Sequence, residues 1–472
     1  MNRNAELLKN TLILSIGTFV PKLMTLITLP ILTACLNTKE YGNYDLILSL
    51  ASLLIPILTL QIQQAVFRHL ISSQKIENKK TYITGSLLFV IASFLISCPI
   101  IYLCLEIANI DPVLRILICI MLSSEGIYYL IGQIVRGIGK NLLYSFSVIV
   151  YSISNMISIV LLVWIMHLGL MGVIISLSIG YIMSCIYMLA VVKVLKYFDI
   201  RCVSFTSLKE LLSFSAPIVP SSISLWIVNL SDRLIVTTFL GVSANGIYSV
   251  ANKVPQLYST AYNIFNLAWT ETASRVHDDE NPAGYYSELF KTLYDFLIGV
   301  MLALISITPI VFKILVNKQF EEAYSQVPIL YFGVFFNSIV QFYAGIYIAY
   351  KRTKQVGISS AVGAVINLVV NLLFVESIGL YAASVSTAIS YLAIALYRAY
   401  DLSKVIKMKY EAGRLTIGMA AFVVSSILAC QNAVMPNLLC VLLAIVYNLI
   451  MNRKLIMNFA TMIKKRKGAS YD

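Results

Sequence analysis

Residues 211–240 read LLSFSAPIVPSSISLWIVNLSDRLIVTTFL, and Asp232 and Arg233 are the only charged side chains in this stretch. A membrane-spanning helix needs about 20 mostly apolar residues, so the stretch is long enough to cross a bilayer. A charge in hydrocarbon costs roughly 2.5 to 3.5 kcal/mol on insertion scales, and such a residue therefore faces a protein interior or a water-filled cavity. Lys22 and Lys253 occupy similar positions in other hydrophobic stretches. Several enclosed cations in one membrane protein indicate a path for an anionic substrate.

The composition of the 472-residue chain independently indicates a membrane protein. Hydrophobic residues make up 59% of the chain and charged residues only 12%. The mean hydropathy is +0.84, a value outside the range of soluble globular domains. In a soluble protein the net charge of +13 would suggest a nucleic-acid partner. Here the basic residues cluster between apolar stretches, so membrane topology explains them and we expect no nucleic-acid partner.

The length criterion finds about fourteen transmembrane helices, which predicts an all-α polytopic membrane protein. The predicted spans are residues 11–35, 44–66, 82–106, 113–135, 142–166, 168–193, 211–240, 244–272, 289–316, 325–349, 356–376, 378–400, 412–430 and 434–452. Cytoplasmic loops are enriched in lysine and arginine. With both termini in the cytoplasm, outer loops contain only Lys39, Arg115, Lys313 and Lys318 of the 35 basic residues. The charge distribution therefore supports this count and this orientation.

The first span and the cysteines bear on processing and on metal binding. The first span contains Pro21, Lys22 and Pro30 and has no small-residue cleavage site after a clean apolar core, so we expect no removable signal peptide. The eight cysteines are scattered without metal-ligand spacing. This pattern predicts neither disulfides nor a zinc site, and we expect no bound metal or organic cofactor.

Two weak internal repeats relate the first half of the chain to the second. An offset of 204 residues pairs Leu36 with Leu240, Gly42 with Gly246 and Tyr44 with Tyr248, and an offset of 210 pairs Gly169 with Gly379, Ser176 with Ser386 and Tyr181 with Tyr391. Both offsets relate each span to the sixth span after it, so the two halves have the same membrane orientation. We therefore expect two six-helix lobes related by a pseudo-twofold axis along the membrane normal, plus two extra C-terminal helices. The predicted parts are an N-lobe at 1–193, a cytoplasmic interlobe linker at 194–210, a C-lobe at 211–400, and spans 13 and 14 with a basic cytoplasmic tail at 401–472.

Polar residues recur with helical spacing on four spans. Spacings of three and four residues place side chains on one face of a helix. The polar faces consist of Thr11, Ser15, Thr18, Lys22 and Thr25 in span 1, Asp45, Ser49, Ser52, Pro56, Thr59 and Gln63 in span 2, Ser222, Trp226, Asn229 and Arg233 in span 7, and Ser249, Lys253, Gln256, Thr260 and Asn263 in span 8. We expect these faces, two per lobe, to line a water-accessible central cavity. For any single Ser, Thr or Asn, a hydrogen bond between helices is the alternative role.

The chain resembles a known family, the Wzx-type oligosaccharide flippases, or polysaccharide biosynthesis transporters, of the multidrug/oligosaccharidyl-lipid/polysaccharide exporter superfamily. The motifs that carry the resemblance are Ser231-Asp232-Arg233-Leu234, Phe239-Leu240-Gly241, Asn245-Gly246-Ile247-Tyr248-Ser249, Phe265-Asn266-Leu267-Ala268-Trp269-Thr270 and Tyr41-Gly42-Asn43-Tyr44. The resemblance implies a bacterial inner-membrane carrier that moves a polyprenyl-pyrophosphate-linked oligosaccharide to the outer leaflet by alternating access, for a surface polysaccharide such as O-antigen, lipopolysaccharide or capsule. Polysaccharide polymerase machinery is a candidate partner.

The residues expected to bind this substrate come from the polar faces. They are Lys22, Trp226, Asn229, Asp232, Arg233, Lys253, Gln256 and Asn263. The three cations would hold the pyrophosphate, because charge-assisted hydrogen bonds are strong in a low-dielectric site. The amides offer donors and acceptors to sugar hydroxyls, and Trp226 or Trp269 offers a ring for stacking. Arg233 has a competing interpretation, a structural ion pair with a carboxylate such as Asp45.

Glu125 in span 4 is the deepest isolated carboxylate, with Tyr128, Tyr129 and Gln133 nearby on the same helix. It is a candidate for binding a coupling proton or sodium ion. The alternatives are a hydrogen-bonded structural role and a role as counter-ion for Lys22.

Two other functional classes remain as alternatives. The sister multidrug exporters share the fold but usually have about twelve spans and acidic sites for cations, whereas this chain places Lys22 in span 1. A membrane enzyme, such as a polysaccharide polymerase or a glycosyltransferase, generally carries a sizeable outer loop for its chemistry. Every predicted outer loop here is short, and the sequence contains no recognisable catalytic motif. We therefore expect a carrier without catalytic residues. The sugar repeat, the final polymer, the energy source and the oligomeric state stay open.

Overall fold

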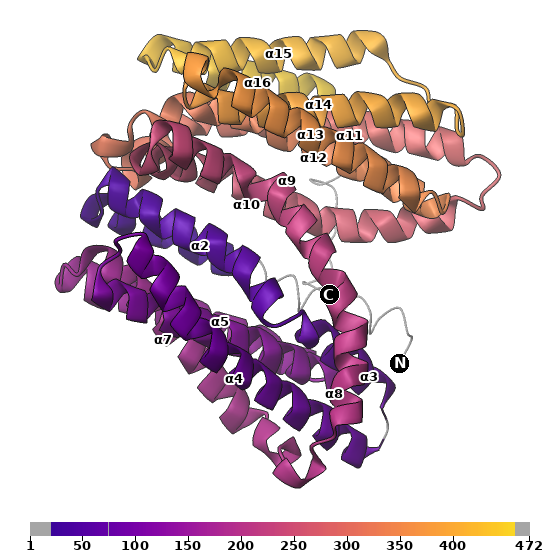
Figure 1. Cartoon of the computed structure of the whole chain (residues 1–472). Helices are drawn as coiled ribbons and strands as arrows, with labels where there is room; N and C mark the ends of the chain where they lie inside the picture. The colour runs from indigo at the N-terminus through magenta and orange to yellow at the C-terminus, as the bar shows by residue number, and fades with distance from the viewer. Residues whose placement is uncertain (1–19, 74, 458–472) are drawn as a thin grey trace, which may run out of the picture. The chain divides into compact units, whose positions relative to one another are not determined.

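The computed structural model describes residues 20–73 and 75–457, and all regular elements in these ranges are helices (Figure 1). Contacts between Cα atoms divide the chain into two compact units, Met1–Gly246 and Ile247–Asp472. The boundary falls near the start of helix α10 (Val242–Val276). The predicted lobe boundaries at residues 193 and 210 refer to sequence repeats rather than to contact clusters, and they stay a prediction.

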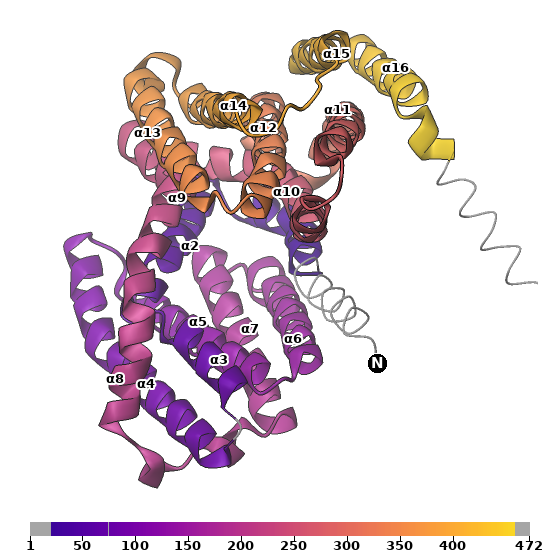
Figure 2. The ribbon, with the colours of Figure 1, turned by 90° about the vertical axis from the view of Figure 1, so that its right-hand side faces the viewer.

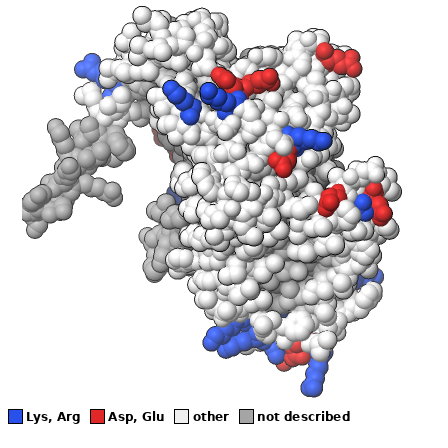
Figure 3. All heavy atoms as spheres, turned by 90° about the vertical axis from the view of Figure 1, so that its left-hand side faces the viewer, with Lys and Arg blue, Asp and Glu red and all other residues white. Residues whose placement is uncertain are grey.

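Ten of the described helices are long and apolar enough to cross a membrane. The other four predicted spans correspond to Val20–Cys35, the described part of the span 11–35, and to the more polar helices α9 (Val219–Leu240), α10 and α14 (Tyr381–Ser403). The first three carry Lys22, Arg233 and Lys253. The face drawn in Figure 3 is mostly uncharged, with charged side chains in small groups. The prediction of about fourteen helices in a polytopic membrane protein therefore agrees with the structure.

The first unit is built around α5. Besides Val20–Cys35, α8 (Phe205–Ser215) and α9, its helices are α2 (Thr38–Leu58), α3 (Ile62–Ser72), α4 (Ile76–Ile107), α5 (Pro112–Gly137), α6 (Asn141–Ile159) with its π-helical extension η1 (Val160–Ile165), and α7 (Gly169–Val191). Helix α5 packs against α3, α4 and α7, as Figure 2 shows. It begins with Asp111 as its N-cap, whose side chain accepts hydrogen bonds from the backbone N–H groups of Val113 and Leu114, and Pro112 follows as the first helical residue.

The structure corrects the predicted span 44–66, which is interrupted in its middle. Helix α2 ends at Leu58 and α3 begins at Ile62, and between them Leu60 and Gln61 have left-handed φ angles of 46° and 54°. Pro56 removes one backbone N–H from the helix just before this break. The Gln61 side chain donates a hydrogen bond of 2.8 Å to the Ser222 hydroxyl. Backbone groups at a break in a membrane helix need partners, because lipid does not solvate them; here the Thr59 hydroxyl donates to the Ile55 carbonyl at 2.8 Å, and the Ile62 N–H donates to the Thr59 carbonyl at 3.0 Å.

The connector between the two repeats is more ordered than the sequence indicated. It contains two 3-10 turns, η2 (Val194–Tyr197) and η3 (Ile200–Cys202), and helix α8 (Phe205–Ser215), and the turn η4 (Ala216–Ile218) joins α8 to α9. The predicted span 211–240 is therefore divided, with Pro217 and Pro220 at the bend. Asp199 caps η3, and its pKa is lowered by the backbone N–H of Arg201 and by Lys80, whose Nζ lies 3.4 Å from Asp199 Oδ2.

The second unit contains α11 (Pro282–Leu315), the turn η5 (Lys318–Phe320), α12 (Ala323–Ala349), α13 (Thr353–Ile378), α14, α15 (Ala412–Cys430) and α16 (Val434–Met451), together with α10 from Ile247 onward. Helix α14 packs against α12 and α13, while α15 and α16 pack on α11 (Figures 1 and 2). Polar contacts hold α15 and α16 against α11. Arg414 of α15 lies 2.8 Å from the buried Asp295 carboxylate, and Asn448 of α16 donates to the Gly299 carbonyl at 3.1 Å.

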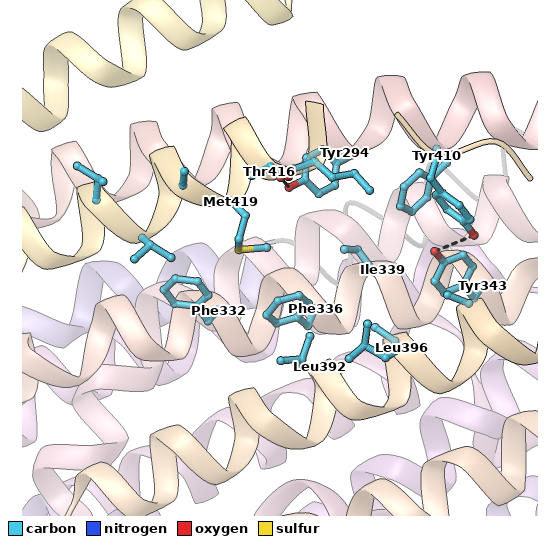
Figure 4. A pocket seen from close by; sticks show the side chains of 17 residues that line it. Tyr294, Phe332, Phe336, Ile339, Tyr343, Leu392, Leu396, Tyr410, Thr416 and Met419 are labelled. Atoms are coloured by element: carbon cyan, nitrogen blue, oxygen red, sulfur yellow. Dashed lines mark hydrogen bonds between the residues drawn. The ribbon is translucent and has the colours of Figure 1, made fainter. Parts of the chain in front are cut away.

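An apolar groove of about 1060 Å³ lies between these layers of the second unit. Its walls come from α11, α12, α14 and α15, and Figure 4 shows aromatic and aliphatic side chains such as Phe332, Phe336 and Met419 pointing into it. Near one end the Tyr343 hydroxyl donates a hydrogen bond of 3.2 Å to the Tyr410 hydroxyl.

Candidate functional site

Arg233 forms a buried ion pair with Asp45. The Arg233 Nε atom of α9 lies 2.7 Å from Asp45 Oδ2 of α2, and the two side chains are only 8% and 6% exposed. The Asn245 amide, at the start of α10, donates to the Gly42 carbonyl at 3.1 Å and approaches Asp45 Oδ2 at 3.5 Å. The sequence offered two roles for Arg233, and the ion pair with Asp45 is present in this structure. Substrate contact by Arg233 stays a prediction.

The polar faces of α2 and α9 meet one another. The Trp226 indole donates a hydrogen bond of 2.7 Å to the Ser49 carbonyl, and the contact between Gln61 and Ser222 extends the same seam. Trp226 is buried, so its role as a stacking surface for a sugar stays a prediction. Part of the predicted cavity lining thus provides hydrogen bonds between helices, which was the alternative for single residues on these faces.

Two repeat-related glycines make a reciprocal contact at the starts of α2 and α10. A Cβ atom on Gly42 would lie 2.0 Å from the Val242 carbonyl oxygen, and a Cβ atom on Gly246 would lie 2.1 Å from the Thr38 carbonyl oxygen. The offset of 204 residues relates Gly42 to Gly246 and also Thr38 to Val242. A twofold axis produces this kind of exchange, in which each partner repeats the contact of the other. The contact agrees with the expected pseudo-twofold relation.

The other predicted substrate residues differ in exposure. Lys22 and Asn263 are exposed, Lys253 and Gln256 are half-buried, and Asp232 is buried. Lys22 lies in the first unit and Lys253 in the second, and their convergence on one ligand stays a prediction. The polar face of span 1 begins with Thr11, Ser15 and Thr18, which lie outside the described residues, as does the side chain of Asn229.

Glu125 lies in a pocket of tyrosines within the first unit. The residue is 6% exposed, and the hydroxyls of Tyr129 and Tyr181 lie near its carboxyl group. The Tyr181 ring stacks on the Tyr151 ring with a centroid distance of 4.7 Å. The sequence identified Glu125 and Tyr129 but did not connect them with Tyr151 and Tyr181, which come from α6 and α7.

Sequence reasoning missed the role of Arg398. Its side chain in α14 is 1% exposed and donates to the carbonyls of Val340 in α12 and Val356 in α13 at 2.8 and 3.1 Å. It also donates to the Ser359 hydroxyl at 2.9 Å. The sequence contained a signal for this burial, because Arg398 lies inside the apolar stretch 378–400, two residues before its end. Its hydrogen bonds fasten three helices of the second unit.

The sequence of this chain matches one known protein family. The profile of the family described as "Polysaccharide biosynthesis protein" matches residues 7–277, which is more than half of the chain. No curated protein sequence matches the chain.

Several solved structures share the fold. The lipid II flippase MurJ in an inward closed conformation superposes with a TM-score of 0.70 at 16% sequence identity, covering 94% of this chain and 99% of that one. An inward-facing multidrug resistance MATE family transporter of the MOP superfamily has a TM-score of 0.66 at 14% identity, covering 84% and 98%. A mutant of the Vibrio cholerae MATE transporter VcmN has a TM-score of 0.57 at 12% identity, covering 85% and 97%. These structures confirm the fold that the resemblance implied.

Proposed function

This chain belongs to the polysaccharide biosynthesis protein family, and from that membership we propose that it is a flippase for lipid-linked oligosaccharides. The chain is a multi-pass membrane protein with the fold of the MurJ and MATE transporters. Its substrate is a polyprenyl-pyrophosphate-linked repeat unit, which crosses from the cytoplasmic to the outer leaflet of the bacterial inner membrane. The product supplies a surface polysaccharide of the O-antigen or capsule type, and both termini lie in the cytoplasm.

The observation that carries this proposal is the placement of cations on predicted membrane helices. Arg233 and Lys253 lie on α9 and α10, which are more polar than the ten apolar spans, and Lys22 lies on the apolar helix Val20–Cys35. A charge on such a helix is retained only where it faces polar surroundings. At a separation of 4 Å, two opposite unit charges attract by about 4 kcal/mol at an effective dielectric constant of 20. A pyrophosphate carries enough negative charge to engage several cations at once.

The ion pair of Arg233 with Asp45 is a contact that the bound substrate can break. Arg233 has five N–H donors in a planar fork that fits phosphate oxygens as well as carboxylates. In the proposed cycle the pyrophosphate competes with Asp45 for Arg233 and thereby loosens the contact between α2 and α9. The polyprenyl chain stays at the protein–lipid boundary, where the apolar groove of the second unit offers it a surface.

A deletion strain tests the proposal. Loss of the gene should leave a polyprenyl-pyrophosphate oligosaccharide on the cytoplasmic leaflet, and the wild-type gene should relieve this accumulation. The double variant Lys22→Ala, Lys253→Ala should insert into the membrane without restoring export, and it leaves Arg233 in its ion pair with Asp45. Lys354, exposed in the first turn of α13, provides the control, because Lys354→Ala should restore export fully. Wild-type export by the double variant would refute the role of the cations.

Because the fold is similar to that of MATE transporters, the alternative function is the export of cationic drugs coupled to an ion gradient. Substrate charge distinguishes the two functions. A deletion strain that accumulates no lipid-linked saccharide but becomes sensitive to cationic drugs would establish the exporter. A membrane polymerase or glycosyltransferase finds no support in the neighbours named above, which are a flippase and transporters.

A further inference from the structure

Glu125 is a buried carboxyl group in the middle of a membrane helix. It lies twelve residues from Gly137 at the end of α5, or about 18 Å at 1.5 Å per residue. Its Oε2 atom is buried and accepts no hydrogen bond from the part of the chain that the structure describes. No basic side chain in residues 20–73 and 75–457 forms an ion pair with it. An isolated carboxylate in such surroundings is costly, so the group must be neutralised by a proton or by a bound cation.

Tyrosine hydroxyls from two helices face the carboxyl group. The hydroxyls of Tyr129, one turn along α5, and Tyr181 of α7 lie near the carboxyl group. The Tyr181 ring stacks on the Tyr151 ring of α6 with a centroid distance of 4.7 Å. The fourth ring, Tyr128, stands 5.4 Å from Tyr181 and 5.8 Å from Tyr151 between ring centroids. These neighbours are neutral, so none of them replaces the missing counter-charge.

The other titratable groups near α5 are engaged elsewhere or lie far along the helix. Among them are Tyr44 and Asp45 on α2, Arg68 and His69 on α3, Cys98 on α4, Arg115, Cys119 and Arg136 on α5 itself, Tyr144 on α6 and Cys185 on α7. Asp45 is bonded to Arg233. Arg136 lies over the Phe67 and Tyr144 rings, eleven residues and about 16 Å along α5 from Glu125. Helix α3 meets α5 at this same end, where Gly137 touches Leu70.

The ligand set favours a proton over a metal cation. Hard cations gather six or more oxygen ligands, several of them carboxylates, whereas Glu125 is the one carboxylate of this tyrosine cluster in the described ranges. No cluster of three His, Cys, Asp or Glu side chains occurs in the described ranges. We propose that Glu125 is a proton-binding site, in which the carboxylate takes up one proton to become a neutral carboxylic acid hydrogen-bonded among Tyr129 and Tyr181.

Two neighbours connect the proposed site with its surroundings. Tyr129 is 43% exposed, so this neighbour of Glu125 reaches the surface of the unit. Tyr44 interacts both with Tyr151 and with Asp45, the next residue in the sequence. Uptake of a proton thus alters a tyrosine cluster that borders the Asp45–Arg233 pair. As the driving ion of the carrier, a use that rests on the proposed function, this proton would bias the contact between α2 and α9.

Infrared difference spectroscopy on the purified full-length protein, with no substrate present, tests the site separately from transport. A protonated carboxyl group gives a carbonyl stretching band that an ionised one lacks. A pH titration of the wild-type protein in lipid nanodiscs should give such a band, and Glu125→Gln should remove it. Glu376→Gln, at an exposed carboxylate in α13, should leave the band intact. Tyr181→Phe keeps the ring and removes one hydroxyl, so it should retain the band at a shifted frequency.

Several results would overturn the proposal. The band could persist in Glu125→Gln, could be absent from the wild-type protein at every pH, or could stay at the same frequency in Tyr181→Phe. Disappearance of the wild-type band on adding sodium chloride, but not choline chloride, at constant pH would assign the site to a sodium ion instead. Helical circular dichroism and size-exclusion chromatography confirm the fold of each variant. If Glu125→Gln does not fold, the frequency shift in Tyr181→Phe decides.

Discussion

The ion pair between Asp45 and Arg233 should contribute strongly to stability, and a double-mutant cycle measures its contribution. The Nε–Oδ2 distance is 2.7 Å and both side chains are more than nine-tenths buried. Removing one partner leaves an uncompensated buried charge, which typically costs about 3 to 5 kcal/mol. Asp45→Ala and Arg233→Ala should therefore each lower the folded-to-unfolded ratio by roughly two to four orders of magnitude.

The double variant separates the value of the pair from the cost of a stranded charge. Because Asp45→Ala with Arg233→Ala removes both charges, it should be less destabilised than the sum of the single variants, with an interaction energy of about 2 kcal/mol or more. Equilibrium unfolding in mixed detergent micelles gives the four free energies. The exposed pair of Arg275 and Glu271 serves as control, since loss of a surface pair changes stability by at most about 1 kcal/mol. Strictly additive single variants, or changes no larger than those of the control, would refute this account of the pair.

Three further predictions follow from particular contacts. Gly42→Ala places a Cβ atom against a backbone carbonyl and should destabilise the protein by about 1 to 3 kcal/mol. Gly357 has open space around it, so the control Gly357→Ala should be neutral or stabilising. Equal melting temperatures for the two variants would contradict this prediction. Arg398→Lys keeps the charge but loses the guanidinium group whose N–H donors bond to α12 and α13. The melting temperature of Arg398→Lys should therefore fall close to that of Arg398→Met. A wild-type melting temperature for Arg398→Lys would contradict this role of the guanidinium group. Because the pKa of Asp199 is lowered on folding, its contribution to holding the connector is present above the unfolded pKa and is lost as the pH falls through the folded pKa. Limited proteolysis of the connector should therefore increase in acid and, for Asp199→Asn, already at neutral pH; equal protection of the variant and the wild type at neutral pH would contradict it.

Hydrophobic length and charge placement were sufficient to predict most of the fold. The stretches that became α4, α5, α7 and α11 are long and apolar, and no tertiary contact is needed to recognise them as spans. The break between α2 and α3 was not predicted, although Pro56 lies just before it, and the Gln61 side chain at the break bonds to Ser222, a residue distant in sequence. Likewise, the sequence placed a linker where α8 packs against α3 and α4.

The candidate site was predictable in its residue types but not in its pairings. The sequence placed Arg233 inside the membrane and named Asp45 as one partner, and only the three-dimensional structure selects that carboxylate. The four tyrosines around Glu125 come from three helices, and periodicity along one helix cannot bring such residues together. The reciprocal glycines are an exception, because the repeat offset already paired Gly42 with Gly246.

Flipping by the purified protein in proteoliposomes is the most direct measurement of the central claim. A fluorescent polyprenyl-pyrophosphate oligosaccharide should move between leaflets in the presence of the wild-type protein, and its monophosphate analogue should move far more slowly. Because each charge-assisted hydrogen bond contributes about 1.5 to 3 kcal/mol, Lys22→Ala and Lys253→Ala should each reduce the rate by roughly tenfold or more. Equal flipping of the two lipids, unchanged by either substitution, would contradict a cationic path for the pyrophosphate.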